Sequence, residues 1–105
     1  MTLKELLKKD FQVELPISGG TGNSIDNPII IHRVGINDYT GTERFVLDCL
    51  GKGRRIKWRI LGQELLFHEN KKIDKIKIET QQVAETEIIT QVENFYFDIT
   101  ECFGY

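Results

Sequence analysis

The stretch RFVLDCLGKGRRIKWRIL, residues 44–61, carries the strongest local pattern in the chain. Every second residue is apolar along each of its two arms, and these residues are Phe45, Leu47 and Cys49, then Ile56, Trp58 and Ile60. A period of two is typical of β-strands. The GKG between the arms is typical of a short turn. The stretch therefore predicts a β-hairpin that turns Cys49 and Trp58 toward the core.

The chain after this stretch repeats the same plan. QELLFHE, NKK and IDKIKIET over residues 63–80 predict two strands joined by a turn. QQVAETE, residues 81–87, is polar and predicts either a turn or the tip of a long hairpin. IITQVENFYFDIT, residues 88–100, is partly apolar on both faces, which is typical of a central strand.

The chain before this stretch begins with a helical pattern. TLKELLKK predicts a helix over about residues 2–9, with Thr2 as the N-cap and Glu5 three positions later. FQVEL and PIIIHRV predict strands over residues 11–15 and 28–34. The remaining segments of this part predict the loops 17–27 and 35–43, both of which contain glycines.

These elements predict an α+β fold that is mainly β. A short N-terminal helix precedes a six- to eight-stranded antiparallel meander, arranged as a curled sheet, a small barrel or a sandwich. No alternation of strand, helix and strand is present, which argues against a parallel doubly wound sheet. The length of 105 residues predicts one domain over 1–105, strand-rich from 11 to 103.

Composition points to a folded protein of the cytoplasm. Hydrophobic residues make up 40% and charged residues 29% of the chain, which is typical of a globular domain. No apolar run approaches the roughly 18 residues that span a bilayer, so no membrane partner is expected. Charged residues interrupt the N-terminus where a signal peptide would be apolar. Cys49 and Cys102 form no CxxC pair and are expected to be buried thiols.

No local motif in the chain predicts catalysis, a metal or a cofactor. GGTGNS, residues 19–24, lacks the GK[ST] of a phosphate-binding loop and leads into a strand, so we expect a structural loop. The potential metal ligands are far apart in sequence and show no recognisable spacing: His32, His68, Cys49 and Cys102. We therefore expect a protein that is not an enzyme, with no metal and no cofactor.

Charge is separated along the sequence. Residues 51–77 carry nine Lys and Arg against three acidic residues, whereas residues 78–105 carry six acidic residues and no basic one. We expect cross-strand pairing between these two regions to account for most of the basic stretch. The candidate binding residues are Lys52, Arg54, Arg55, Lys57 and Arg59, and Glu85, Glu87 and Glu93.

This charge layout favours a non-enzymatic protein-interaction domain, of an immunity, antitoxin or adaptor type, whose charged sheet faces dock an unidentified protein. A first alternative is a weak nucleic-acid-binding β module that uses the basic hairpin, residues 52–59. A second is a small-ligand carrier with an apolar cavity. An exposed sheet edge would also allow a homodimer.

Overall fold

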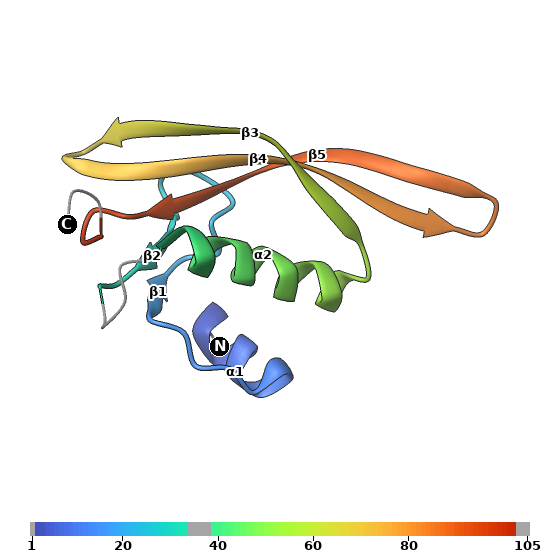
Figure 1. The fold of residues 1–105 in the computed structure, drawn as a ribbon, viewed down its shortest axis with the longest axis horizontal. Coiled ribbons are helices and arrows are strands. Elements are labelled where there is room, and N and C mark those ends of the chain that lie inside the picture. Colours follow the sequence, from blue (N-terminus) through green and yellow to red (C-terminus); the bar gives the residue numbers. More distant parts are fainter. Residues whose placement is uncertain (1, 34–38, 103–105) are drawn as a thin grey trace.

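A computed structural model of the chain describes residues 2–33 and 39–102, which form two helices and one five-stranded sheet (Figure 1). In chain order these are α1 (Leu3–Phe11), β1 (Ile17–Gly19), β2 (Ile29–Ile31), α2 (Tyr39–Arg54), β3 (Lys57–His68), β4 (Lys71–Ala84) and β5 (Glu87–Asp98).

The sheet has the order β1-β2-β5-β4-β3. The β2–β5 pair is parallel and the other neighbouring pairs are antiparallel. A mainly β fold with an N-terminal helix is thus confirmed. The described residues contain five strands instead of the six to eight predicted, and their sheet is mixed instead of antiparallel throughout. The sheet is not closed into a barrel.

The N-terminal helix forms as its capping residues predict. The Thr2 hydroxyl accepts the Glu5 backbone N–H, and the Glu5 carboxylate accepts from Thr2, so a complete capping box begins α1. The strand predicted over residues 11–15 is wrong, because α1 continues to Phe11. Gln12 then ends the helix in the left-handed region, at φ 56°, with its N–H donated to the Lys8 carbonyl.

The hairpin predicted over residues 44–61 is the largest error, because its first arm is helical. The buried residues of α2 include Glu43, Val46 and Leu47, and Leu50 is partly buried against the same core. This spacing of three, four and seven residues places them on one helix face. Phe45, part of the apparent strand alternation, is exposed on the opposite side. Because Glu43 belongs to this buried face, the apolar residues alone do not show the full helical pattern in the sequence.

A Schellman motif ends α2 without a glycine at its left-handed position. The Ile56 N–H donates to the Gly51 carbonyl and the Arg55 N–H donates to the Lys52 carbonyl. Arg55 takes the left-handed conformation at φ 58°. A Cβ atom on Gly51 would lie 3.0 Å from Trp58 Cδ1. Gly51 thus allows α2 to approach β3, and the GKG sequence is the end of a helix rather than a turn between strands.

The three long strands confirm the strand character predicted for residues 63–80 and 88–100, but the strands expected on either side of Gly62 are one strand, β3. β3 and β4 meet at a two-residue turn in which Glu69 and Asn70 both have positive φ. β4 and β5 keep one unbroken register from Ile73↔Asp98 to Ala84↔Glu87. The polar segment 81–87 is therefore the tip of a long hairpin.

A β-bulge interrupts the pairing of β3 with β4 at Leu61, because Ile60 pairs with Ile78 whereas Gly62 pairs with Lys77. The extra residue reverses which side chains of β3 face α2. Trp58 and Ile60 pack against the core before the bulge. Gln63 faces the α2 side after it, where it pairs with Ile76. We call the sheet face covered by α2 the helix face and the opposite one the outer face.

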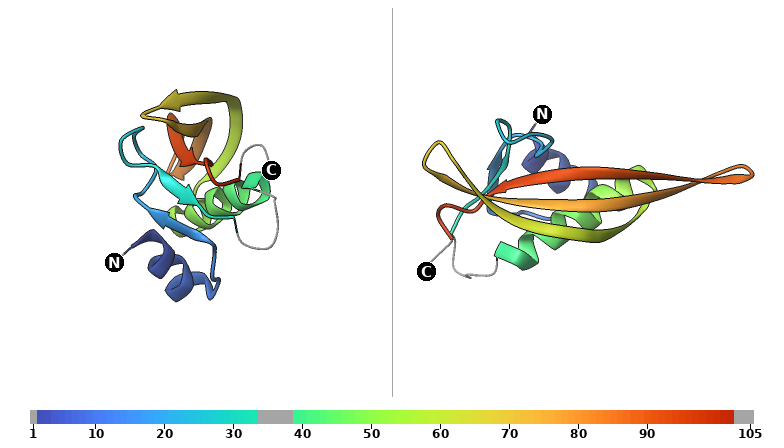
Figure 2. Two further views of the ribbon diagram at one scale, coloured as in Figure 1. Left: turned by 90° about the vertical axis from the view of Figure 1, so that its left-hand side faces the viewer. Right: turned by 90° about the horizontal axis from the view of Figure 1, so that it is seen from above.

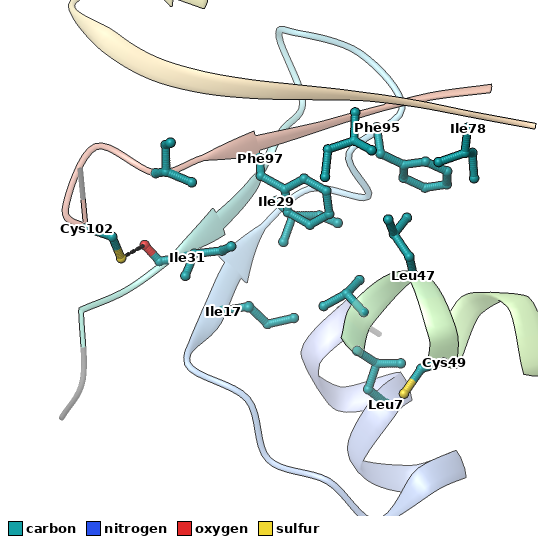
Figure 3. Close-up of a cluster of buried hydrophobic side chains, with 13 residues drawn as sticks. Leu7, Ile17, Ile29, Ile31, Leu47, Cys49, Ile78, Phe95, Phe97 and Cys102 are labelled. Carbon is teal, nitrogen blue, oxygen red and sulfur yellow. Dashed lines mark hydrogen bonds between the residues drawn. The ribbon is translucent and has the colours of Figure 1, made fainter. Parts of the chain in front are cut away.

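The hydrophobic core lies between the two helices and the helix face of the sheet (Figure 3). Its largest buried apolar side chains include Leu7, Ile17, Ile29, Leu47 and Phe97. Both cysteines are buried free thiols, as predicted, and the Cys102 thiol contacts the Ile31 carbonyl at 3.7 Å. Burial raises the pKa of both thiols, which makes them poor nucleophiles.

Two acidic side chains are buried together where α2 lies against β4. Glu43 is 0% exposed and Asp74 is 4% exposed. Among the described residues, neither carboxyl oxygen of Glu43 has a hydrogen-bond partner, whereas Asp74 accepts from the Gln63 amide at 2.6 Å. Burial, followed by the neighbouring Asp74 carboxyl, raises the pKa of Glu43 to about 10. Glu43 is therefore neutral at pH 7.

The molecule is elongated along the β4–β5 hairpin, with extents of 47 × 29 × 22 Å. Figure 2 shows the hairpin extending well past both helices, with α1 and α2 gathered near its base. Among the described helices, none is long and apolar enough to cross a membrane.

Candidate protein-interaction surface

The β4–β5 hairpin projects beyond the rest of the sheet. β3 begins opposite Gln81, so the part of the hairpin from 82 to 89, here called the distal hairpin, has no third strand beside it. Figure 1 shows this segment passing the end of α2. Two-stranded β structure without a packed face is marginally stable alone, so the distal hairpin depends on its base for order.

The side of β5 that faces away from β4 is largely unpaired among the described strands. β2 covers only Phe97 and Asp98, and the Tyr96 N–H donates to the Gly22 carbonyl at 2.8 Å. Backbone groups alternate along a strand, so every second residue before Tyr96 points its N–H and C=O to the same side. We call this segment, Ile88–Asn94, the open β5 edge.

The open β5 edge has few of the features that protect most edge strands, and its one charged side chain, Glu93, is paired with Arg54. It contains no proline, no lysine and no bulge. The outer edge of the sheet at β3 differs, because it carries Lys57, Arg59 and the Leu61 bulge. The third edge, at β1, is only three residues long. Among the described strands, β5 therefore offers the longest unprotected edge.

Apolar side chains are exposed beside this edge. Val83 and Ile88 lie directly opposite each other and are 77% and 65% exposed. Val92 shares their face and is 53% exposed, while Ile89 lies on the helix face and is 39% exposed. Single exposed apolar residues are common on protein surfaces, whereas a group of exposed apolar side chains is more typical of a surface that a partner covers.

Two of the three predicted acidic residues lie at the tip of the hairpin. Glu85 occupies the turn, with φ 42°, and Glu87 begins β5; both are exposed. Glu93 is instead half-buried and accepts two hydrogen bonds from the Arg54 guanidinium. The bond from Arg54 lowers the pKa of Glu93. Glu93 therefore stabilises the base of the hairpin, and the exposed acidic charge is at the tip.

The five predicted basic residues do not form one row. Lys52 and Arg54 belong to the last turn of α2, and Arg55 follows it. Only Lys57 and Arg59 lie on β3, and Arg59 donates to Glu79 at 3.0 Å. The expected pairing of basic with acidic segments thus occurs at Arg54–Glu93 and Arg59–Glu79.

Trp58 lies on the side of β3 opposite to Lys57 and Arg59, as its parity predicts. It packs against the core, and its indole N–H donates to Asp48 at 3.1 Å. The ring is therefore occupied in packing α2 against β3 and does not serve as a platform on the basic side of the strand.

The glycine loop is structural in its hydrogen bonding. The Gly20 and Gly22 N–H groups donate to the Pro28 and Asn27 carbonyls, both at 2.9 Å. A Cβ atom on Gly20 would lie 1.8 Å from the Asn27 side-chain oxygen. These two N–H groups are therefore occupied and do not face an anion, which agrees with the structural interpretation of the loop.

One group of hydrogen-bonded polar residues shows no local motif in the sequence. Ser18 Oγ lies 2.6 Å from His32 Nε2, and His32 Nδ1 lies 2.6 Å from Glu101 Oε2. Ser18 and His32 come from β1 and the end of β2, and Glu101 follows β5. Only the pairing of β1 with β2 would have predicted this contact, because the Ser18↔Ile30 register places Ser18 diagonally opposite His32.

The second histidine lies elsewhere. His68 Nε2 lies 3.1 Å from an Asp26 carboxylate oxygen, and Glu69 is also near this exposed pair. The two histidines and the two cysteines thus do not converge on one site.

Comparison of the chain with protein-family models, with curated proteins and with solved structures finds no match.

Proposed function

We propose that this protein is an interaction domain that binds an extended segment of a partner protein by strand addition to the open β5 edge. The observation that carries the proposal is the unpaired stretch Ile88–Asn94 on a projecting hairpin. A partner strand would form main-chain hydrogen bonds with the outward-facing groups of Ile88, Thr90, Val92 and Asn94. The rest of the fold holds this edge in place.

The side chains around the edge define the chemistry of the partner segment. Val83, Ile88 and Val92 would contact alternate apolar side chains of an added strand. Glu85 and Glu87 would attract Lys or Arg in the same segment and speed its association. We therefore expect an extended partner segment that combines apolar and basic residues and lacks acidic ones.

A second copy of the chain is a less suitable occupant. A second β5 strand carries acidic residues and no basic one, so it offers no charge complementary to Glu85 and Glu87. In the antiparallel register centred on Thr90, Glu87 of each copy would also lie opposite Glu93 of the other. Like charges directly opposite each other destabilise a sheet. Light scattering of the purified chain separates the two cases, because self-pairing predicts a concentration-dependent dimer whereas the proposal predicts a monomer.

The structure does not favour the two alternative functions. Of the five candidate basic residues for a nucleic-acid surface, Arg54 and Arg59 bond to acidic side chains. The other three, Lys52, Arg55 and Lys57, come from the end of α2, the residue after it and β3, and do not form one row. A carrier would need an enclosed space. The sheet is open, and the gap lined by Leu47 and Phe95 between α2 and the strands has a volume of about 10 Å³, enough for at most one water molecule.

Selection of peptides from a random display library on the immobilised full-length chain tests the proposal. We expect enriched peptides that alternate apolar and basic residues. Thr90→Pro removes one outward N–H from the open β5 edge, and proline is tolerated at sheet edges. This variant should no longer bind the selected peptides. Glu85→Lys with Glu87→Lys should weaken binding at least about tenfold, and more strongly at low salt.

Asp10→Lys with Glu14→Lys is the matched control, because it also replaces two exposed acidic residues by lysine, on and just after α1 and outside the hairpin. Its binding should equal that of the unmodified chain. Peptides that bind Thr90→Pro as tightly as the original chain would refute binding at the β5 edge.

A further inference from the structure

Ser18, His32 and Glu101 form a continuous chain of hydrogen-bonding side chains on the outer face of the sheet. Both contacts, Ser18 Oγ to His32 Nε2 and His32 Nδ1 to Glu101 Oε2, are 2.6 Å long. Ile17, Ile29 and Ile31 point into the core, so the alternating residues Ser18 and His32 lie on the opposite side. All three polar side chains are at least partly open to solvent.

We propose that these residues are a nucleophile, a general base and its positioning residue, and that the site transfers acyl groups from small carboxylic esters. The arrangement meets the geometric requirement for an activated hydroxyl, in which a base lies within hydrogen-bond reach and a third group orients that base. The three residues come from distant segments, so the absence of a local motif, on which the expectation of a non-enzymatic protein rested, does not bear on them.

The Glu101 carboxylate determines which nitrogen of His32 is available. A carboxylate next to Nδ1 favours the tautomer that carries its proton there, as N–H donated to Glu101. Nε2 then presents its lone pair to the Ser18 hydroxyl. Glu101 also stabilises the imidazolium that forms when His32 accepts the serine proton. Glu101 is therefore a positioning residue, whereas Ser18 and His32 act on the substrate.

A backbone donor for the developing negative charge lies next to the nucleophile. Ser18 pairs with Ile30 between the Pro16–His32 and Gly20–Pro28 hydrogen bonds, so the Ser18 carbonyl points toward β2. In a trans peptide the following N–H points the opposite way. The Gly19 N–H therefore points away from β2, in the plane of the sheet and next to Ser18, and is the candidate donor to an oxyanion formed there.

The reaction balances with an ester and water alone. Ser18 Oγ bonds to the ester carbonyl carbon while its proton passes to His32 Nε2. The tetrahedral intermediate then breaks its bond to the alcohol oxygen, which leaves with that proton, and an acyl-Ser18 ester remains. Water adds to this ester by the same two steps, and the carboxylic acid is released. Ser18 is exposed, so we expect little selectivity among the alcohol groups of the ester.

The full chain incubated with p-nitrophenyl acetate tests the proposal. We expect a burst of nitrophenolate equivalent to one acetyl group per chain, and peptide mass analysis should locate that acetyl group on Ser18. Ser18→Ala should abolish the burst. His32→Asn should slow it by about 100-fold, the lower range for a general base. Ser24→Ala, which replaces another serine of the same region, should leave the burst unchanged.

Glu101→Gln distinguishes positioning from simple structural support. We expect a slower burst together with a shift of the His32 tautomer toward protonated Nε2, read from the ring ¹⁵N chemical shifts. Three results would each overturn the proposal. They are nitrophenolate release from Ser18→Ala equal to that from the unmodified chain, acetylation of a lysine instead of Ser18, and no burst in the unmodified chain. Thr90→Pro should retain the burst, so failure of this site is separable from failure of the β5 edge.

Discussion

The Arg54 guanidinium donates two hydrogen bonds to the Glu93 carboxylate, at 2.8 and 2.6 Å. This contact joins the end of α2 to Glu93, which lies near the end of the open β5 edge closest to the core. It also joins the basic and acidic regions of the sequence. The hairpin that carries the proposed binding edge is thus fixed at its base by an ion pair and by the core residues next to it.

Loss of this ion pair should destabilise the fold modestly and in a pH-dependent way. Arg54 is well exposed, so we expect Arg54→Ala to lower the free energy of unfolding by only about 1 kcal/mol. Because Arg54 lowers the pKa of Glu93, the pair stabilises the fold above the unfolded-state pKa of Glu93 and ceases to do so as the pH falls through the folded value.

Urea unfolding at pH 7 and pH 3 of Arg54→Ala, Glu93→Gln and the double variant measures this effect. The coupling between the two residues should be present at pH 7 and smaller at pH 3. An equal coupling at both pH values would contradict the assignment of Glu93 as an ionised partner.

Glu43 should give the opposite pH dependence. Its pKa is raised to about 10 in the folded chain, so Glu43 holds a proton that the unfolded chain releases above pH 4.5. Stability from this group is complete below pH 4.5 and is lost as the pH rises toward the folded value, by at most about 1.4 kcal/mol per pH unit.

We therefore expect Glu43→Gln to flatten the fall in unfolding free energy between pH 5 and pH 8 and to be more stable than the original chain at pH 8, by about 2 kcal/mol. Glu64→Gln, which replaces an exposed glutamate of β3, is the control and should preserve the original pH dependence. A pH dependence unchanged by Glu43→Gln would show that Glu43 is ionised in the fold.

Arg55→Gly should stabilise the protein. Arg55 occupies the left-handed position of the Schellman motif at φ 58°, which costs a residue with a side chain about 1 kcal/mol relative to glycine. We expect the midpoint of urea unfolding to rise by the equivalent of about 0.5–1 kcal/mol, because glycine also increases the freedom of the unfolded chain. A lower midpoint would mean that contacts of the Arg55 side chain outweigh its backbone strain.

The sequence predicted the β3–β5 region well because its signals are local. The apolar alternation around Ile76 and Ile78 predicts a strand, and Asn70 predicts a turn. Both patterns depend only on residues close together in the sequence. The error at α2 has an equally physical cause. The alternation of Phe45 with Leu47 imitates a strand, and the true helical stripe contains Glu43, which a pattern based on apolar residues overlooks.

The candidate sites depend on long-range pairing, which a single sequence does not reveal. The β5 edge is open because β2 pairs only near Phe97, and no local signal reports the length of a neighbouring strand. The Ser18–His32–Glu101 chain likewise requires β1 to pair with β2 and the segment after β5 to reach His32. The sequence shows which residues are charged, but not which side chains they contact in the fold.

Amide hydrogen exchange on β5, with and without a selected peptide, tests the central claim most directly. In the free chain the outward amides of Ile88, Thr90 and Val92 should exchange faster than those of Ile89 and Gln91, which face β4. With a saturating peptide, exchange of the outward amides should slow at least about tenfold. Protection that appears elsewhere while Ile88, Thr90 and Val92 still exchange freely would contradict binding by strand addition to β5.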